Sequence, residues 1–217
     1  MDLKYKSWKD ITIDVYEKIR AIKADELNTD EQALDLNIKL LSILCDVDED
    51  TITDLPITEF SNLVSKTEFL KDMPKYTIES TYKVGDRFFD VQTNLRAMTT
   101  AQFIDFQTLV KEQDKNLSNL LACFMLPKGK KYGEDYDIIE VAEYLKKNMS
   151  IAIARSVMFF FTLEYQVLQK VMLDYSIKEM KREMKNEENE ETKKKMEEAI
   201  QQMMQLKDLI KSGAGSI

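Results

Sequence analysis

The most regular hydrophobic pattern in the chain covers residues 150–184, where apolar positions recur at steps of three and four. The recurring positions are Ile151, Ala154, Met158, Phe161, Tyr165, Leu168, Met172 and Tyr175. A second apolar row is formed by Val157, Phe160, Val167 and Val171. One apolar stripe is typical of an amphipathic helix, and a second row indicates that other elements enclose it. The pattern predicts a long core helix whose first half is enclosed.

This segment has too few uncharged residues in a row for a membrane span. Between Arg155 and Glu164 only eight residues are uncharged, whereas a span needs about twenty. We therefore expect a soluble chain that does not bind a membrane.

Two helical patterns precede this segment near the N-terminus. Residues 11–24 favour a helix, although their first positions also alternate as in a strand. Thr29 and Gln32 have the spacing of a capping box, and apolar steps continue from there to Cys45. The sequence therefore predicts a second helix that ends near Cys45.

The acidic run over residues 46–50 resembles the start of a calcium loop. Thr51 stands where such a loop needs glycine, and Ile57 stands where it needs glutamate. Asp48 is better explained as the cap of a short helix, because carboxylates are favoured at helix N-termini. Pro56 then breaks the chain before one more short helix.

The hydrophobic pattern changes after Pro74 and predicts a β-hairpin over about residues 76–92. Aromatic and β-branched residues lie on both sides of Gly85-Asp86, which is a typical hairpin turn. Two strands alone are marginally stable, so we expect the hairpin to pack on helices or to pair with another chain.

Three further helices are predicted between this hairpin and the long helix. Thr99 and Gln102 form another capping-box pair at the start of the first, and Pro127 ends the second. Residues 127–135 contain three lysines and two glycines but lack the order of a phosphate-binding loop, so they predict an exposed loop. The third helix covers about residues 138–145.

The composition changes after Met184 to a charged run with balanced signs. Either one helix continues, or residues 186–189 turn the chain back as a helical hairpin. An apolar stripe follows, and its members are candidates for an interface: Met196, Ile200, Met203 and Ile210. Such a stripe suits packing against a helix of another subunit, although packing within the chain is the alternative. The sequence therefore predicts an oligomer.

These elements define a mainly α fold. We expect a multi-helix bundle with one small β-hairpin and a long C-terminal helix or helical hairpin. Three parts are predicted: an acidic helical module over 1–72, a hairpin with a helical core over 73–177, and a charged helix with a flexible tail over 178–217.

Charge limits the class of partner. The 217 residues carry a formal net charge of -8, and residues 10–59 hold fourteen acidic and four basic side chains. Nucleic-acid surfaces need lysine and arginine, so we expect no nucleic-acid partner. Cys45 and Cys123 lie within apolar patterns and predict buried thiols of a reducing compartment. The first residues do not form a signal peptide, so we expect an intracellular protein.

No stretch of the sequence indicates an enzymatic chemistry. The chain has no histidine, which removes imidazole catalysis and histidine-bound metals. The paired carboxylates lie in solvated runs without the apolar enclosure that would raise a pKa. We therefore predict no enzyme, no catalytic residue, no metal and no cofactor.

A family resemblance adds a functional expectation. Residues 33–64, ALDLNIKLLSILCDVDEDTITDLPITEFSNLV, resemble the helical and Leu-Pro-x-x-Glu-Phe pattern of tail assembly chaperones and tail-module proteins of tailed bacteriophages. Residues 99–137 and the segment MSIAIARSVMFFF are similar to the remainder of such proteins, and the long C-terminal helices depart from the short chaperones. The resemblance implies no catalytic residues.

The resemblance implies a non-enzymatic phage assembly or virion protein. It would act by contacts with other phage proteins, either as a chaperone or as a neck, ring or tail component. The implied location is the host cytoplasm during assembly, and the virion as well if the protein is a structural component. The alternative is a cellular helical adaptor that oligomerises through its C-terminal helix.

Overall fold

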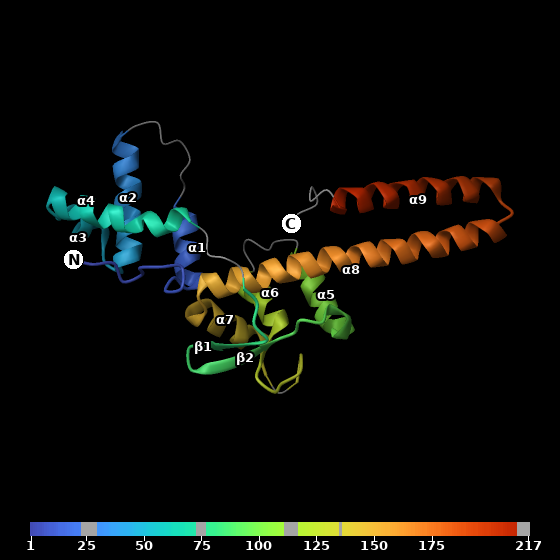
Figure 1. Cartoon of the computed structure of the whole chain (residues 1–217), viewed down its shortest axis with the longest axis horizontal. Helices are drawn as coiled ribbons and strands as arrows, with labels where there is room; N and C mark the ends of the chain where they lie inside the picture. The colour runs from blue at the N-terminus through green and yellow to red at the C-terminus, as the bar shows by residue number, and fades with distance from the viewer. Residues whose placement is uncertain (23–29, 73–76, 111–116, 135, 212–217) are drawn as a thin grey trace. The chain divides into compact units, whose positions relative to one another are not determined.

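The computed structural model describes residues 1–22, 30–72, 77–110, 117–134 and 136–211 (Figure 1). The chain forms two compact units, Met1–Met158 and Phe159–Ile217, each of which is described by itself. Helices dominate the described residues, and a small antiparallel sheet is the main exception, so the mainly α prediction is confirmed. The predicted division into 1–72, 73–177 and 178–217 stays a prediction.

The described α-helices follow the predicted order. They are α1 Ile13–Ala21, α2 Asp30–Cys45, α3 Glu49–Thr53, α4 Ile57–Lys66, α5 Thr100–Leu109, α6 Leu117–Phe124, α7 Ile138–Asn148, α8 Ile151–Asn186 and α9 Glu190–Lys211. Two 3-10 helices, η1 Thr67–Lys71 and η2 Leu95–Ala97, lie beside α4 and before α5 in the chain. The predicted cap Thr29 lies outside the described residues.

Helix α2 ends in a Schellman motif. The Val47 amide donates to the Ser42 carbonyl (3.0 Å), and the Asp46 amide donates to the Ile43 carbonyl (3.3 Å). Asp46 has a left-handed φ of 59°, which few residues other than glycine adopt. Asp48 then stands at the N-cap of α3, as predicted, but its side chain makes no capping hydrogen bond.

The start of the chain is tied to the junction between α7 and α8. The Ile151 amide donates to the Ile11 carbonyl (2.7 Å), and the Ile13 amide donates to the Met149 carbonyl (3.1 Å). All four side chains are fully buried, so these backbone groups are satisfied inside the core. The first unit is therefore closed by contacts between residues far apart in the sequence.

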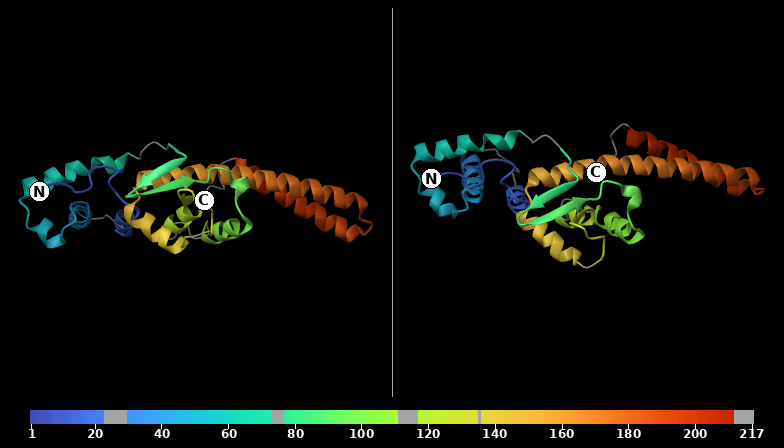
Figure 2. Two further views of the ribbon diagram at one scale, coloured as in Figure 1. Left: turned by 90° about the horizontal axis from the view of Figure 1, so that it is seen from below. Right: turned by 60° about the horizontal axis from the view of Figure 1, so that its bottom comes forward.

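The predicted hairpin is confirmed, and a third strand extends it. Strands β1 Thr81–Val84 and β2 Arg87–Val91 pair around Gly85-Asp86 (Figure 2). Strand β2 also pairs with β3 Met125–Pro127. Helix α6 thus ends at Phe124, so the prediction that it continues to Pro127 was wrong. Residues 125–127 exchange helical for sheet hydrogen bonds with β2, which a local pattern does not reveal.

Only the Thr99 half of the predicted capping box is formed, because the Gln102 side chain bonds elsewhere. The Thr99 hydroxyl accepts from the Gln102 amide (3.1 Å), as a cap should. The Gln102 side chain, however, is buried and donates from Nε2 to the Cys123 carbonyl (2.5 Å) at the end of α6. This bond satisfies a buried polar group and fixes α5 to the α6–β3 junction.

The enclosure of α8 is shorter than its apolar pattern. Ile151, Ala154, Val157 and Phe161 are buried, and burial continues to Tyr165. The later members of both predicted rows, namely Val167, Val171, Met172 and Tyr175, are exposed. The second row is therefore only partly enclosed. The spacing of apolar residues continues beyond Tyr165, so the spacing alone does not show at which residue burial ends.

Tyr144 of α7 holds the turn between β1 and β2. Its hydroxyl lies 3.0 Å from the Val84 carbonyl oxygen, accepts from the Asp86 amide at 3.1 Å and also contacts the Asp86 carboxylate. This contact lowers the pKa of the Asp86 carboxyl. Gly85 has a φ of 57°, and a Cβ there would overlap the Tyr144 hydroxyl, so both backbone and space require glycine.

We predict that Tyr144→Phe raises the pKa of Asp86 toward its ordinary value and lowers the melting temperature. The lost bond from the Asp86 amide to the Tyr144 hydroxyl costs about 1 kcal/mol. Because the folded-state pKa of Asp86 is depressed, its contribution to stability exists above the ordinary pKa and disappears as pH falls through the folded value. The melting difference should therefore shrink in acid.

NMR titration of the Asp86 carboxyl carbon and melting curves across pH measure both effects. Tyr175→Phe is the matched control, since Tyr175 is exposed and should leave both quantities unchanged. An unaltered Asp86 pKa in Tyr144→Phe would contradict the assigned contact.

Candidate interaction surface

The described residues do not assemble a metal site. Among them, no three Cys, Asp or Glu residues are placed to hold a metal ion. The features that do stand out are two grooves and the exposed side chains of a helical hairpin.

The groove of the first unit is about 510 Å³ and lies beside α1, α2 and the end of α7. Two of its three acidic side chains are paired: Lys18 Nζ lies 2.9 Å from Asp14 and Lys4 Nζ lies 2.6 Å from Asp46. The bond to Lys4 lowers the pKa of the Asp46 carboxyl. The third acidic residue, Asp48, has no ion-pair partner among the described residues, so the groove contains two closed ion pairs and one unpaired carboxylate.

The two cysteines are free, buried thiols, as predicted. Burial raises the pKa of Cys123 to about 11, although a hydrogen bond with Tyr132 partly opposes the shift. The Tyr132 hydroxyl also donates to the Asp105 carboxylate (2.6 Å). Burial likewise raises the pKa of Cys45. A thiol in such surroundings is a packing group, because the thiolate is the reactive form.

We predict that neither thiol of the native protein reacts readily with iodoacetamide near pH 8. A pKa of about 11 leaves roughly one Cys123 in a thousand as thiolate at that pH, even before burial blocks the reagent. Mass spectrometry after timed labelling measures the modification, and protein unfolded in guanidinium is the control. Fast labelling of Cys123 in the native state would contradict its burial.

The second unit is a helical hairpin, the second of the two alternatives left open by the sequence. Helices α8 and α9 run side by side in opposite directions, and an ion pair between Lys207 and Asp174 joins them (Figure 1). The Asn189 side chain caps α9 by accepting from the Glu191 amide (2.9 Å) and the Thr192 amide (3.1 Å). The turn is therefore built by local hydrogen bonds.

The four predicted interface residues all lie on α9. Ile200 is only 6% exposed, and Met196, Met203 and Ile210 are partly buried. Ile177 of α8 is also buried, at 9% exposed. The stripe is therefore largely covered within the chain itself, and its predicted role between subunits stays a prediction.

One row of α8 faces outward, and we call it the α8 outer face. It comprises Leu163, Val167, Val171, Tyr175, Lys178 and Arg182. The four apolar members are 45–65% exposed, and the two basic members are exposed as well. The sequence pattern placed Val167 and Val171 in a second apolar row and predicted enclosure only for the first half of the helix. The change from apolar to basic residues along the row was the signal that could have identified this face.

A groove of about 520 Å³ follows the basic end of this row. It is lined by Asp174, Ile177, Lys178, Glu179, Lys181, Arg182 and Lys185. Arg182 pairs with Glu179 at 3.5 Å, whereas Lys178, Lys181 and Lys185 have no ion-pair partner among the described residues. The groove is thus positively charged within an acidic protein.

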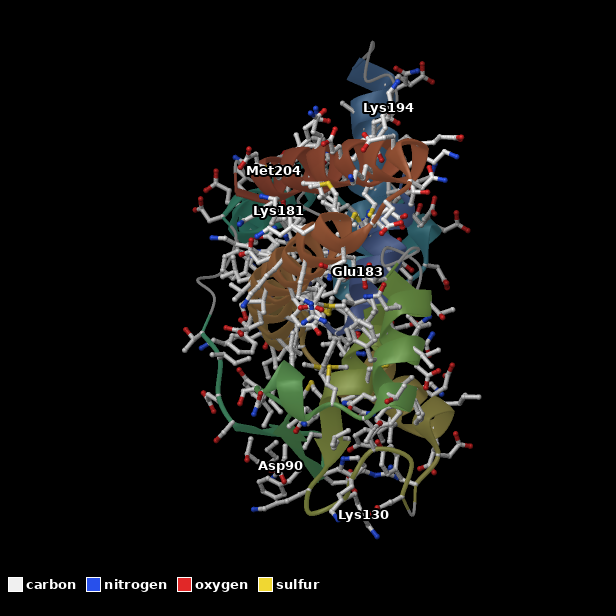
Figure 3. All side chains as sticks on the ribbon, turned by 90° about the vertical axis from the view of Figure 1, so that its right-hand side faces the viewer. Asp90, Lys130, Lys181, Glu183, Lys194 and Met204 are labelled. Carbon is white, nitrogen blue, oxygen red and sulfur yellow. The ribbon has the colours of Figure 1, made fainter. Side chains whose placement is uncertain are left out.

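Helix α9 carries an outward row of mixed charge, which we call the α9 outer face. One side of the helix carries Glu191, Lys195, Glu198, Gln202 and Leu206 at steps of three and four, and all are exposed. Figure 3 shows charged side chains along both helices, with Lys181 and Glu183 on α8 and Lys194 on α9. Near the turn, the α8 outer face is therefore basic, whereas the α9 outer face carries charges of both signs.

By length and composition, α8 could cross a membrane. It is the one helix of this kind in the described part of the chain, and 41% of its most apolar window is buried. Core helices of soluble proteins pass the same test, so the expectation of no membrane contact stays a prediction.

No family model, curated protein or solved structure matches this chain.

Proposed function

We propose that the chain is a non-enzymatic assembly protein that works through helical contacts with other proteins. The setting is the assembly of a tailed bacteriophage, as a tail assembly chaperone or as a neck, ring or tail component. The observation that carries the proposal is the α8 outer face, where four large apolar side chains in one row are exposed. The resemblance of residues 33–64 and 99–137 to tail-module proteins supports the phage setting.

The size of this row indicates the kind of contact. Complete burial of an apolar side chain contributes about 1.5–3 kcal/mol, so four half-exposed ones contribute roughly 3–6 kcal/mol before the cost of association. A free energy of about -4 kcal/mol corresponds to a millimolar dissociation constant. The apolar row alone therefore supports a weak contact, which suits a protein that acts in many copies or beside further contacts.

The first test is the location of the protein. Quantitative mass spectrometry of infected cells and of purified particles, for a phage that encodes this chain, should detect the protein in the cells. Its presence in particles identifies a structural component, and its loss from them identifies a chaperone. Absence from both cells and particles would overturn the proposal.

A cellular helical adaptor is the second candidate, because a helical hairpin with an exposed apolar row also suits an adaptor. The gene neighbourhood separates the two: genes for a tail tube and tape measure beside this one support the phage assignment. A host locus without phage genes supports the adaptor.

We predict that truncation after Met184 leaves the first unit folded and abolishes association. The removed helix α9 belongs to the second unit, in which Lys207 pairs with Asp174, while the first unit has its own core. Light scattering measures the mass and calorimetry measures the melting temperature. An unchanged mass with a strongly lowered melting temperature would show that α9 serves the chain's own core instead.

A further inference from the structure

The two faces of the small sheet differ in burial. One face packs on the core, and its residues are at most 7% exposed: Tyr82, Val84, Phe89 and Val91. Alternate residues of a strand point to opposite faces, so Lys83 and Phe88 lie on the other side, and both are exposed. We call this side, formed by Thr81, Lys83, Phe88 and Asp90, the sheet outer face. Phe88 lies on the middle strand β2 and is 48% exposed.

A lysine lies on each side of the Phe88 ring. Lys83 pairs with Phe88 across β1 and β2, and Lys83 Nζ lies 5.9 Å from the ring centroid. On the β3 side, the Lys128 amide donates to the Phe88 carbonyl (2.9 Å), and Lys128 Nζ lies 5.5 Å from the same centroid. Neither lysine has an ion-pair partner among the described residues. An exposed aromatic ring is therefore flanked by two cations that no described carboxylate neutralises.

The loop after β3 adds positive charge beside this face. Lys130 and Lys131 of the loop are exposed, and Figure 3 labels Lys130 together with Asp90 of the sheet. The strands, their turn and residues 128–131 hold five basic and two acidic side chains. Asp90 accepts from the Thr81 hydroxyl (2.7 Å) and the Gly129 amide (3.2 Å), and the other acidic residue, Asp86, is bonded to Tyr144. The lysines are thus the charged groups left to bind a ligand.

We propose that the sheet outer face binds single-stranded nucleic acid: a base stacks on the Phe88 ring, and the phosphates on either side of that base contact Lys83 and Lys128. Proteins that bind single strands combine positive charge along the backbone with aromatic rings on which bases stack, and both are present here. An ammonium group binds a phosphate more strongly than an exposed ring, so the two lysines leave the ring to the base. Lys130 and Lys131 extend the positive surface toward the next nucleotides.

This occupant explains the ring as well as the lysines. A duplex keeps its bases stacked inside the helix, so its phosphates use the lysines and leave Phe88 exposed. An acidic peptide likewise pairs with the lysines but does not need a flat aromatic ring. The charge argument against a nucleic-acid partner applies to residues 10–59, whereas this site is formed by residues 81–91 and 125–131. The site therefore lies outside the acidic part of the chain, and it is separate from the α8 outer face.

Fluorescence anisotropy of the full-length protein with a labelled oligothymidylate of about ten nucleotides tests the proposal. Phe88→Leu should weaken binding roughly fivefold to 150-fold, which is the loss of one stacked base (about 1–3 kcal/mol), and should leave the salt dependence unchanged. Phe88→Trp should retain binding. Lys83→Gln/Lys128→Gln should reduce the slope of log affinity against log salt by about 1.4 in magnitude, because each phosphate contact contributes about 0.7.

Lys178→Gln/Lys181→Gln is the matched control, since it removes two exposed lysines from the groove of the second unit and should bind as the wild type does. A duplex should bind more weakly and should not respond to Phe88→Leu. Oligouridylate separates the two sources of a single strand, because the tighter of the two oligomers identifies DNA or RNA as the ligand. Circular dichroism checks the fold, and if Phe88→Leu unfolds the sheet, Phe88→Val replaces it because β-branched residues suit strands.

Several results would overturn the inference. They are no binding at about 50 mM salt, unchanged binding by Phe88→Leu, a duplex that binds as tightly as the single strand, weakened binding by Lys178→Gln/Lys181→Gln, and poly-glutamate that competes as well as the oligonucleotide. The assay depends neither on infected cells nor on self-association. Its failure would therefore leave the proposed function unaffected, and absence of the protein from infected cells would leave this inference unaffected.

Discussion

Helix α8 has more apolar surface than one side of a helix can bury, and this constraint shapes the rest of the structure. Its first turns bury Ile151, Ala154 and Val157 in the core, which uses one side. Leu163 and Val167 then expose apolar surface on the outer face. A helix with apolar residues all round is normally enclosed, so the exposed row is better explained by a missing neighbour than by chance.

The helical hairpin depends on apolar contact more than on its ion pair. Lys207 is largely covered but Asp174 is half exposed, and such pairs contribute at most about 1 kcal/mol. Ile177 and Ile200 are buried, and each removes a branched apolar side chain from water. The ion pair therefore sets the register, while these isoleucines provide most of the stability of the hairpin.

Local signals in the sequence predicted local structure well. Gly85-Asp86 determined the hairpin and Thr99 determined the start of α5, since each acts within four residues. Strand β3 was missed because Met125 pairs with Val91, 34 positions earlier (125 − 91), and three residues carry no period. The stripe through Met196 and Ile200 was recognised, yet its period is the same whether the neighbour is α8 or another chain. Exposure, which separates these cases, is a property of the folded chain.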